Sequence, residues 1–171
     1  MRADSLKGNE VMINPRAEEL AARLEKGRVK TLEVFNNLSH SQMQTPLYND
    51  PIWRVRDLLA HFVSAEIHLL ALARSVASGN PGAPMDFEIN EFNAQEKKRL
   101  AGIPKNELLS MLDQARRKTI EWVMSLSDDE LEKVGRHPAL GEVTVEVMIL
   151  AIYGHQLTHM RELFRLLGSV V

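Results

Sequence analysis

Apolar side chains recur every three or four residues in four segments of the chain, and this period predicts four amphipathic α-helices. The predicted helices cover residues 15–38, 55–76, 104–126 and 144–167. Asn14 and Pro15 supply a cap and a first-turn proline at the start of the first helix, and Gly168 ends the fourth. The stripe of the first helix has one gap, around Gly27. Four helices of similar length favour a bundle.

The segments between these helices are polar or rich in turn residues. Residues 39–51 are expected to form a loop, and the capping box that starts at Ser127 predicts one more short helical turn. Residues 84–102 are expected to hold a short helical piece within a connection that is long for an up-and-down bundle, which favours a crossover or a cover over an active site. No segment shows convincing strand alternation, a repeat or a Gly-rich phosphate loop.

These patterns predict an all-α protein, a four-helix bundle with a long connection between its second and third helices. A single domain is expected over residues 1–171, because a chain of this length can bury one core of ordinary size. Residues 1–13 are expected to be a flexible or loosely packed N-terminal segment.

The composition excludes several classes of protein. The chain has no cysteine, which excludes disulfides and thiolate metal sites, so any sulfur chemistry needs an outside thiol. Its 21 basic and 23 acidic side chains give a net charge of -2, which argues against binding to nucleic acid or to an anionic membrane. The basic clusters at 97–99 and 116–118 are expected to be solvated helix faces. No apolar run approaches the roughly 18 residues that cross a bilayer, and residues 1–14 do not resemble a signal peptide, so a cytoplasmic protein is expected.

Three histidines on two predicted helices are the candidate functional residues. His155 and His159 are four residues apart, so both rings lie on one helix face, one turn apart, within reach of one metal ion. His61 lies on the inner stripe of the second helix, and all three rings would cost desolvation energy if nothing bound them. Three neutral imidazoles with an open position form a common catalytic metal site. The spacing alone leaves hydrogen-bonded core histidines as an equal alternative.

The residues near the histidines argue against two metalloenzyme patterns. Gln156 stands directly after His155, where the metalloprotease pattern requires a glutamate base. No histidine has a glutamate three residues before it, as di-iron bundles require. Asp57, Glu66 and Glu162 lie within one or two turns of the candidate ligands, where a carboxylate orients an imidazole, adds a further ligand or is simply exposed.

The other three histidines are expected to have lesser roles. His68 lies about 10 Å from His61 along the helix axis, which is too far for both to bind one ion. It is expected to be a core residue or one that supports the ligands. His40 and His137 fall in predicted loops and are expected to be exposed, with no special role.

Two stretches of sequence resemble signatures of the DinB-like family. Residues 53–61 read WRVRDLLAH, which is similar to the tryptophan, valine, aspartate, double-leucine and histidine pattern that opens the family's second helix. Residues 153–159 read YGHQLTH, which is similar to the family's fourth-helix histidine pair. The resemblance covers nearly the whole chain and implies a bundle that holds one divalent ion, zinc or nickel above all, through His61, His155 and His159, and that forms a homodimer.

Further residues are candidates for lining the pocket or supporting the metal ligands, namely Trp53, Asp57, His68, Asn93 and Glu162. Asn93 belongs to this group because Phe92 and Asn93 resemble a step that relatives carry near the mouth of the metal site. Arg54 departs from the family, in which serine or threonine commonly caps the second helix, so the cap is expected to come from Asp50 or water.

The sequence alone leaves three functions open. Relatives include transferases and an isomerase that use bacillithiol or mycothiol, which implies a thiol S-transferase whose metal ion stabilises the thiolate of a low-molecular-weight thiol. The second function is a non-enzymatic, dimerising module that binds a metal ion or a small ligand. The third is metal-assisted hydrolysis, for which the sequence shows no obvious general base. A small-molecule ligand and a second copy of the chain are the expected partners.

Overall fold

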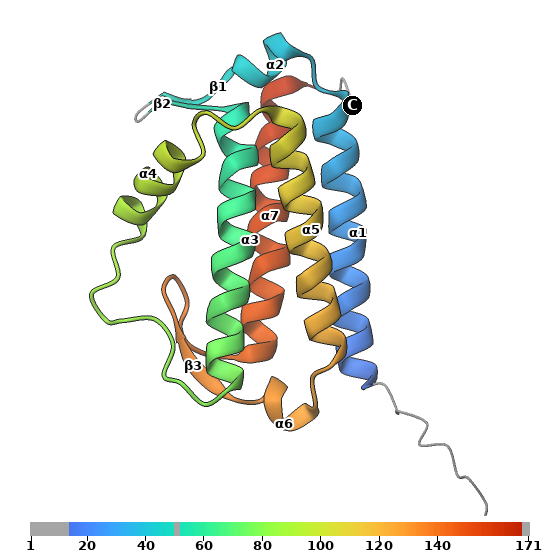
Figure 1. Ribbon diagram of the computed structural model, residues 1–171, viewed down its shortest axis with the longest axis vertical. Helices are drawn as coiled ribbons and strands as arrows, with labels where there is room; N and C mark the ends of the chain where they lie inside the picture. Colours follow the sequence, from blue (N-terminus) through green and yellow to red (C-terminus); the bar gives the residue numbers. More distant parts are fainter. Residues whose placement is uncertain (1–13, 50–51, 169–171) are drawn as a thin grey trace, which may run out of the picture.

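The computed structural model describes residues 14–49 and 52–168, so the expected flexible segment at 1–13 lies outside the described residues. Its body consists of four long helices, α1 (Pro15–Asn37), α3 (Val55–Ala77), α5 (Lys105–Met124) and α7 (Val145–Leu167) (Figure 1). Three shorter helices are α2 (His40–Gln44), α4 (Ile89–Arg99) and α6 (Asp128–Leu131). Four short strands are β1 (Pro46–Asn49), β2 (Ile52–Arg54), β3 (Val134–His137) and β4 (Gly141–Thr144). The all-α four-helix bundle predicted from the sequence is confirmed.

The long helices do not follow one another around the bundle. α1 packs against α5 and α7, and α3 also packs against α5 and α7, so the consecutive helices α1 and α3 occupy opposite corners. α3 and α5 run in the same direction, and the segment between them therefore returns along the length of the bundle (Figure 1). The long connection is thus a crossover, and it carries α4 along the outside of α3.

Local capping explains where the long helices begin. The side chain of Asn14 accepts a hydrogen bond from the Arg16 amide at 3.0 Å, and Thr144 accepts one from the Val147 amide at 3.2 Å. α3 begins without a capping hydroxyl, because its N-cap is Arg54. The Asp57 carboxylate instead accepts the Arg54 N–H at 3.0 Å. The cap of α3 therefore comes from its own first turn, whereas Asp50 lies outside the described residues.

The core has an apolar cluster in each half of the bundle and a polar layer between them. One cluster centres on Phe35 and Leu59, and the other on Leu24 and Ile149. Between the two clusters, the Arg116 guanidinium pairs with the Glu66 carboxylate, and both side chains are at most 2% exposed. The expectation that residues 116–118 form a solvated face is therefore wrong for Arg116.

Gly27 provides the space that the buried arginine needs. A Cβ atom at this position would lie 3.3 Å from Arg116 Nη1 and 3.3 Å from the ring of Tyr153. Arg116 Nη1 donates a hydrogen bond to the Leu24 carbonyl oxygen at 3.0 Å, so the guanidinium lies against the backbone of α1. The gap in the apolar stripe of the first helix therefore marks the entry of a charged side chain from α5.

Two antiparallel strand pairs, β1–β2 and β3–β4, were not expected from the sequence. Each strand has only three or four residues, which is too short for an alternating pattern to stand out. The β3–β4 hairpin pairs Val134 with Thr144 and His137 with Gly141, which has a φ of 75°. Residues 39–51, expected to be a loop, contain α2 and β1 instead.

The β3–β4 hairpin is joined to the start of the crossover. The Ala83 amide donates to the Arg136 carbonyl at 2.8 Å, and the Arg136 amide donates to the Pro81 carbonyl at 2.8 Å. Gly82, between these residues, has a φ of 95°, and a Cβ there would lie 2.5 Å from Arg136 backbone atoms. Glycine is therefore required where the crossover and the hairpin meet.

One helix among the described residues, α3, is long and apolar enough to cross a membrane by length and composition alone. Half of its most apolar 18-residue window is buried inside the bundle. The core helix of a helical bundle passes the same test of length and composition.

Candidate metal centre

The rings of His61, His155 and His159 meet between α3 and α7. The Nε2 atoms of His61 and His155 lie 2.9 Å apart, and one ligand nitrogen from each of the three rings lies within 4.8 Å of the other two. The ring centroids of His155 and His159 are 4.7 Å apart, and those of His61 and His159 are 5.5 Å apart. The fold thus brings together the three histidines that the sequence selected.

The donor set fits a divalent ion with nitrogen ligands. Zinc–nitrogen bonds are about 2.0–2.1 Å long, so two nitrogens on one ion lie no more than about 4.2 Å apart. The 2.9 Å between the His61 and His155 nitrogens falls inside that limit. Small adjustments of the side chains would place the three nitrogens around one ion. The arrangement leaves room for a further ligand, as catalytic zinc sites do.

Glu162 orients one of the candidate ligands. Its Oε2 lies 2.9 Å from Nδ1 of His159, one turn along α7. A carboxylate accepts a hydrogen bond from a ring N–H, so this contact places the proton of a neutral His159 on Nδ1 and leaves Nε2 free of a proton. Carboxylates commonly hold metal-bound histidines in this way.

Burial keeps two of the rings neutral. Desolvation, followed by the neighbouring positive charge of His159, lowers the pKa of His61 to about 4. Desolvation also lowers the pKa of His155 to about 3, with further contributions from His61, His159 and His137. Metal ions bind the neutral form of imidazole, so both rings are in the ligating form at neutral pH.

Trp53 and Asp57 support the site in different ways. The indole ring of Trp53 packs edge-to-face on His61, with centroids 5.6 Å apart, and Lys97 Nζ lies 5.1 Å from the indole centroid. The Asp57 carboxylate caps α3 and lies 3.5 Å from Lys97 Nζ. Asp57 therefore anchors α4 beside the site, through contacts with cations and backbone.

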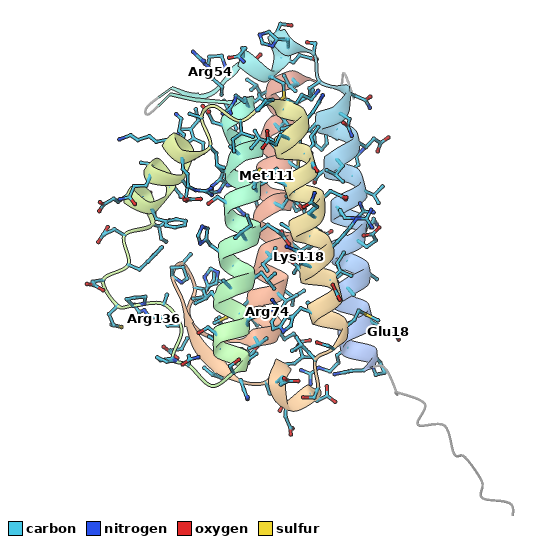
Figure 2. The ribbon with its side chains drawn as sticks, viewed as in Figure 1. Glu18, Arg54, Arg74, Met111, Lys118 and Arg136 are labelled. Carbon is cyan, nitrogen blue, oxygen red and sulfur yellow. The ribbon has the colours of Figure 1, made fainter. Side chains whose placement is uncertain are left out.

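A pocket of about 1500 Å³ opens beside the three rings. Its walls are α3, α7, α4 and the turn of the β3–β4 hairpin, and Figure 2 shows side chains that project into the region between the crossover and the bundle. Most lining side chains are apolar. Its polar lining residues include Asp57, His68, Asn93, Lys97 and His137. The crossover therefore covers a pocket at the candidate metal centre, as its length suggested.

The remaining sequence candidates fall in different places. Asn93 lines the pocket. His68 also lines it, but its side chain is 46% exposed and contacts Phe92 and Glu96, so the expectation of a core residue is wrong. Glu66 neither orients a ligand nor is exposed, because it is buried against Arg116. His40 is exposed at the start of α2, as expected.

His137 is the functional candidate that the sequence reasoning missed. It was expected to be an exposed loop residue, but it lies in β3, is 6% exposed and lines the pocket. Pro138 and Gly141 follow it, and these residues could have indicated a tight hairpin turn.

The fold and the three converging imidazoles define a four-helix bundle protein with a candidate three-histidine metal centre. The chain belongs to the DinB superfamily, whose family model matches residues 23–163. This match confirms the resemblance seen in the sequence. A search of curated proteins finds no match.

Solved structures share this fold at low sequence identity. YfiT from Bacillus subtilis, described as a probable metal-dependent hydrolase with an unusual four-helix bundle topology, is 18% identical, with a TM-score of 0.70 over 95% of this chain and 93% of that one. The mycothiol-dependent maleylpyruvate isomerase is 16% identical, with a TM-score of 0.72. That match covers 91% of this chain but 62% of the isomerase. TT2238, a four-helix bundle protein, is 20% identical, with a TM-score of 0.59 over 85% of this chain and 98% of that one.

Proposed function

We propose that this protein binds one divalent metal ion through His61, His155 and His159 and transfers a low-molecular-weight thiol to an electrophilic substrate. The observation that carries the proposal is the convergence of three imidazoles at the wall of a large, mainly apolar pocket. A divalent ion with neutral ligands keeps its positive charge and lowers the pKa of a bound thiol, so that the nucleophilic thiolate exists at neutral pH. Similarity in fold to a mycothiol-dependent enzyme supports this choice.

The residues of the chain prepare the site for that chemistry. Burial keeps His61 and His155 neutral at neutral pH, so neither ring has to lose its positive charge before a metal ion binds. Glu162 fixes the orientation of His159, and Trp53 packs against His61. These contacts hold the rings in place before any ligand arrives, which reduces the cost of ordering the site.

The size of the pocket favours a reaction between two molecules. Pockets for single drug-sized ligands usually measure about 300–1000 Å³. The pocket here, at about 1500 Å³, exceeds that range. It therefore has room for a thiol and for an apolar electrophile side by side. In the transfer, a sulfur–carbon bond forms while the electrophile loses its leaving group or gains the thiol's proton.

Metal-assisted hydrolysis is the second candidate, supported by the likeness in fold to YfiT. Hydrolysis through a metal-bound water usually needs a general base close to that water. Among the described residues that line the pocket, Asp57 is the one carboxylate, and Lys97 and the first turn of α3 engage it. The two candidates differ in whether the reaction needs a thiol.

The metal ion is tested first, on protein purified without an affinity tag. We expect about one zinc or nickel ion per chain by elemental analysis. His159→Ala should lose the metal ion and keep its helical circular dichroism spectrum, whereas His40→Ala, which alters an exposed histidine on α2, should retain the metal ion. Equal metal content in the two variants would contradict the assignment of His159.

Turnover is tested on the metal-loaded protein. Bacillithiol, mycothiol, glutathione and cysteine would each be mixed with benzyl chloride, and the thioether product measured by chromatography. We expect faster product formation than without protein for at least one thiol, and loss of this activity in His159→Ala. Ester or amide hydrolysis without thiol would favour the hydrolase. Metal binding without either reaction would favour the non-enzymatic module. Homodimerisation and a cytoplasmic location stay predictions.

A further inference from the structure

His137 closes the turn of the β3–β4 hairpin with one of its ring nitrogens. Its Nδ1 accepts hydrogen bonds from the backbone N–H groups of Ala139 at 3.1 Å and Leu140 at 3.2 Å. Asparagine and aspartate side chains often accept bonds from the amides that follow them in this way. Here the imidazole does so, and the backbone of the turn therefore fixes the orientation of the ring.

These two bonds determine which nitrogen carries the proton. Nδ1 uses its lone pair as an acceptor, so it carries no hydrogen. Burial lowers the pKa of His137, which favours the neutral ring with a single N–H. That N–H must be on Nε2. The turn thus presents a hydrogen-bond donor in a fixed tautomer and a fixed direction.

This donor has no partner in the part of the chain that the structure describes. Nε2 of His137 is buried, and the whole residue is 6% exposed. A buried donor without an acceptor costs roughly 1–3 kcal/mol, so folded proteins rarely leave one unpaired without a functional reason. An acceptor supplied from outside the chain would remove this cost.

The position of His137 indicates where that acceptor would come from. The residue lines the same pocket as the three candidate metal ligands. It does not belong to the group of nitrogens that meet at one point, so it is not a fourth ligand of the same ion. The charge of a protonated His137 would act on His155, which places the two rings within electrostatic reach of each other.

We infer that the Nε2–H of His137 donates a hydrogen bond to an oxygen atom of the electrophilic substrate in the pocket, and that the substrate class is an apolar carbonyl compound. This inference rests on the proposed function and adds the substrate class to it. In the addition of a thiol to an unsaturated ketone, sulfur bonds to the β-carbon and the thiol's proton ends on the α-carbon. Negative charge builds on the carbonyl oxygen along the way, where a fixed N–H donor stabilises it.

Two substitutions distinguish the role of Nδ1 of His137 from the role of its Nε2. In His137→Asn, the side-chain oxygen takes the place of Nδ1 and can accept the bonds of Ala139 and Leu140, but the donor at Nε2 is lost. In His137→Gln, the longer side chain carries an N–H donor to the position of Nε2 and loses the acceptor close to the turn. The pair therefore distinguishes a role in the hairpin from a role in binding.

Binding is measured first, without turnover, on the zinc-loaded full-length protein. The probes are benzylacetone, a saturated ketone that carries a phenyl ring, and butylbenzene, which has a similar apolar body and no oxygen. We expect His137→Asn to weaken the binding of benzylacetone roughly threefold to tenfold. Binding of butylbenzene should not change, and His137→Gln should keep most of the affinity for the ketone. Equal loss for both probes, or no loss for either, would overturn the inference.

Nitrogen-15 NMR of the histidine side chains supplies a readout that a purely structural role would not give. We expect His137 to be the Nε2–H tautomer at neutral pH, and its Nε2–H signal to shift with benzylacetone but not with butylbenzene. An Nδ1–H tautomer, or an Nε2–H signal insensitive to the ketone because a trapped water binds it, would overturn the inference.

Turnover links the inference to the proposed function. With an active thiol, His137→Asn should slow conjugation of benzalacetone, an unsaturated ketone, by a clearly larger factor than it slows conjugation of benzyl chloride. Equal slowing of both reactions would overturn the role of His137. If the unsubstituted protein conjugates neither electrophile with any thiol, the proposed function fails. The binding and NMR measurements still test whether His137 donates to a ketone.

Discussion

The buried guanidinium of Arg116 donates a hydrogen bond to the side-chain oxygen of Gln156 at 3.1 Å, and Gln156 is the residue directly after His155. The same guanidinium forms two bonds to the Glu66 carboxylate, of 2.8 and 2.7 Å. Thr119 adds a third bond to that carboxylate, at 2.6 Å. Since Glu66 lies on α3 and Gln156 on α7, the network ties together the two helices that carry the candidate ligands.

Replacing one member of this network should strongly destabilise the protein. Glu66→Gln leaves the charge of Arg116 buried without its counter-ion, which typically costs about 3–5 kcal/mol. The free energy of unfolding would be measured by urea denaturation of the metal-free protein. Arg117→Ala is the matched control, because Arg117 is exposed and pairs with Asp113, and such pairs contribute at most about 1 kcal/mol. A similar loss of unfolding free energy in the two variants would show that the pair of Arg116 and Glu66 does not behave as a buried ion pair.

Glu162→Gln should weaken metal binding while leaving the bundle folded. The substitution keeps the size of the side chain but weakens the bond that orients His159, and losses of such partners usually lower metal affinity about 10–100-fold. Competition with a coloured zinc chelator would measure the affinity. Glu19→Gln, at an exposed glutamate that pairs with Arg23 on α1, should leave the affinity unchanged. An unchanged affinity in Glu162→Gln would show that the carboxylate does not support the ligand.

The metal-free protein should lose stability as the pH falls from neutral toward 5. An unfolded histidine takes up a proton near pH 6.5, whereas the folded pKa values are about 4 for His61 and about 3 for His155. The unfolded state therefore binds more protons between these values, so the free energy of unfolding rises with pH. Each ring contributes about 1.4 kcal/mol per pH unit well below pH 6.5. Urea denaturation at several pH values should show that the free energy of unfolding depends less steeply on pH in His155→Gln than in the unsubstituted protein. An equal dependence on pH in the two proteins would contradict the prediction.

Gly154→Ala should stabilise the fold and disturb the pocket. Gly154 lies within α7, and a Cβ atom there would meet nothing within 4 Å. Alanine is better than glycine inside a helix by about 0.5–1 kcal/mol, so thermal unfolding should occur at a higher temperature. Because Gly154 lines the pocket beside His155, the added methyl group should reduce the affinity for benzylacetone. Higher stability with unchanged affinity would show that no ligand approaches Gly154.

The sequence predicted the long helices and the inward helix face of each of the three histidines, because both depend on local spacing. Asn14, Ser127 and Thr144 cap the helices near the predicted positions, since a cap is formed by residues adjacent in the sequence. His155 and His159 share a helix face for the same reason. Glu162, one turn further on, was also selected in this way.

The features that the sequence did not reveal depend on distant partners. Arg116 stands four residues after Leu112, on the buried side of α5, but its charge led us to expect an exposed side chain. The partner that allows its burial, Glu66, lies fifty residues earlier and cannot be recognised from the local sequence. His137 was assigned to a loop because a strand of four residues gives too little pattern to recognise. Its burial depends on the crossover and α7, which pack around it only in the folded chain.

The diagonal placement of α1 and α3 affects how the chain can fold during synthesis. When only α1 and α3 have emerged from the ribosome, their apolar stripes have nothing to pack against, because both helices pack against α5 and α7 in the folded protein. The emerging chain must therefore remain unfolded until α7 has been made, or depend on chaperones that shield the exposed stripes. Truncation before α7 should yield an aggregating polypeptide rather than a smaller stable bundle.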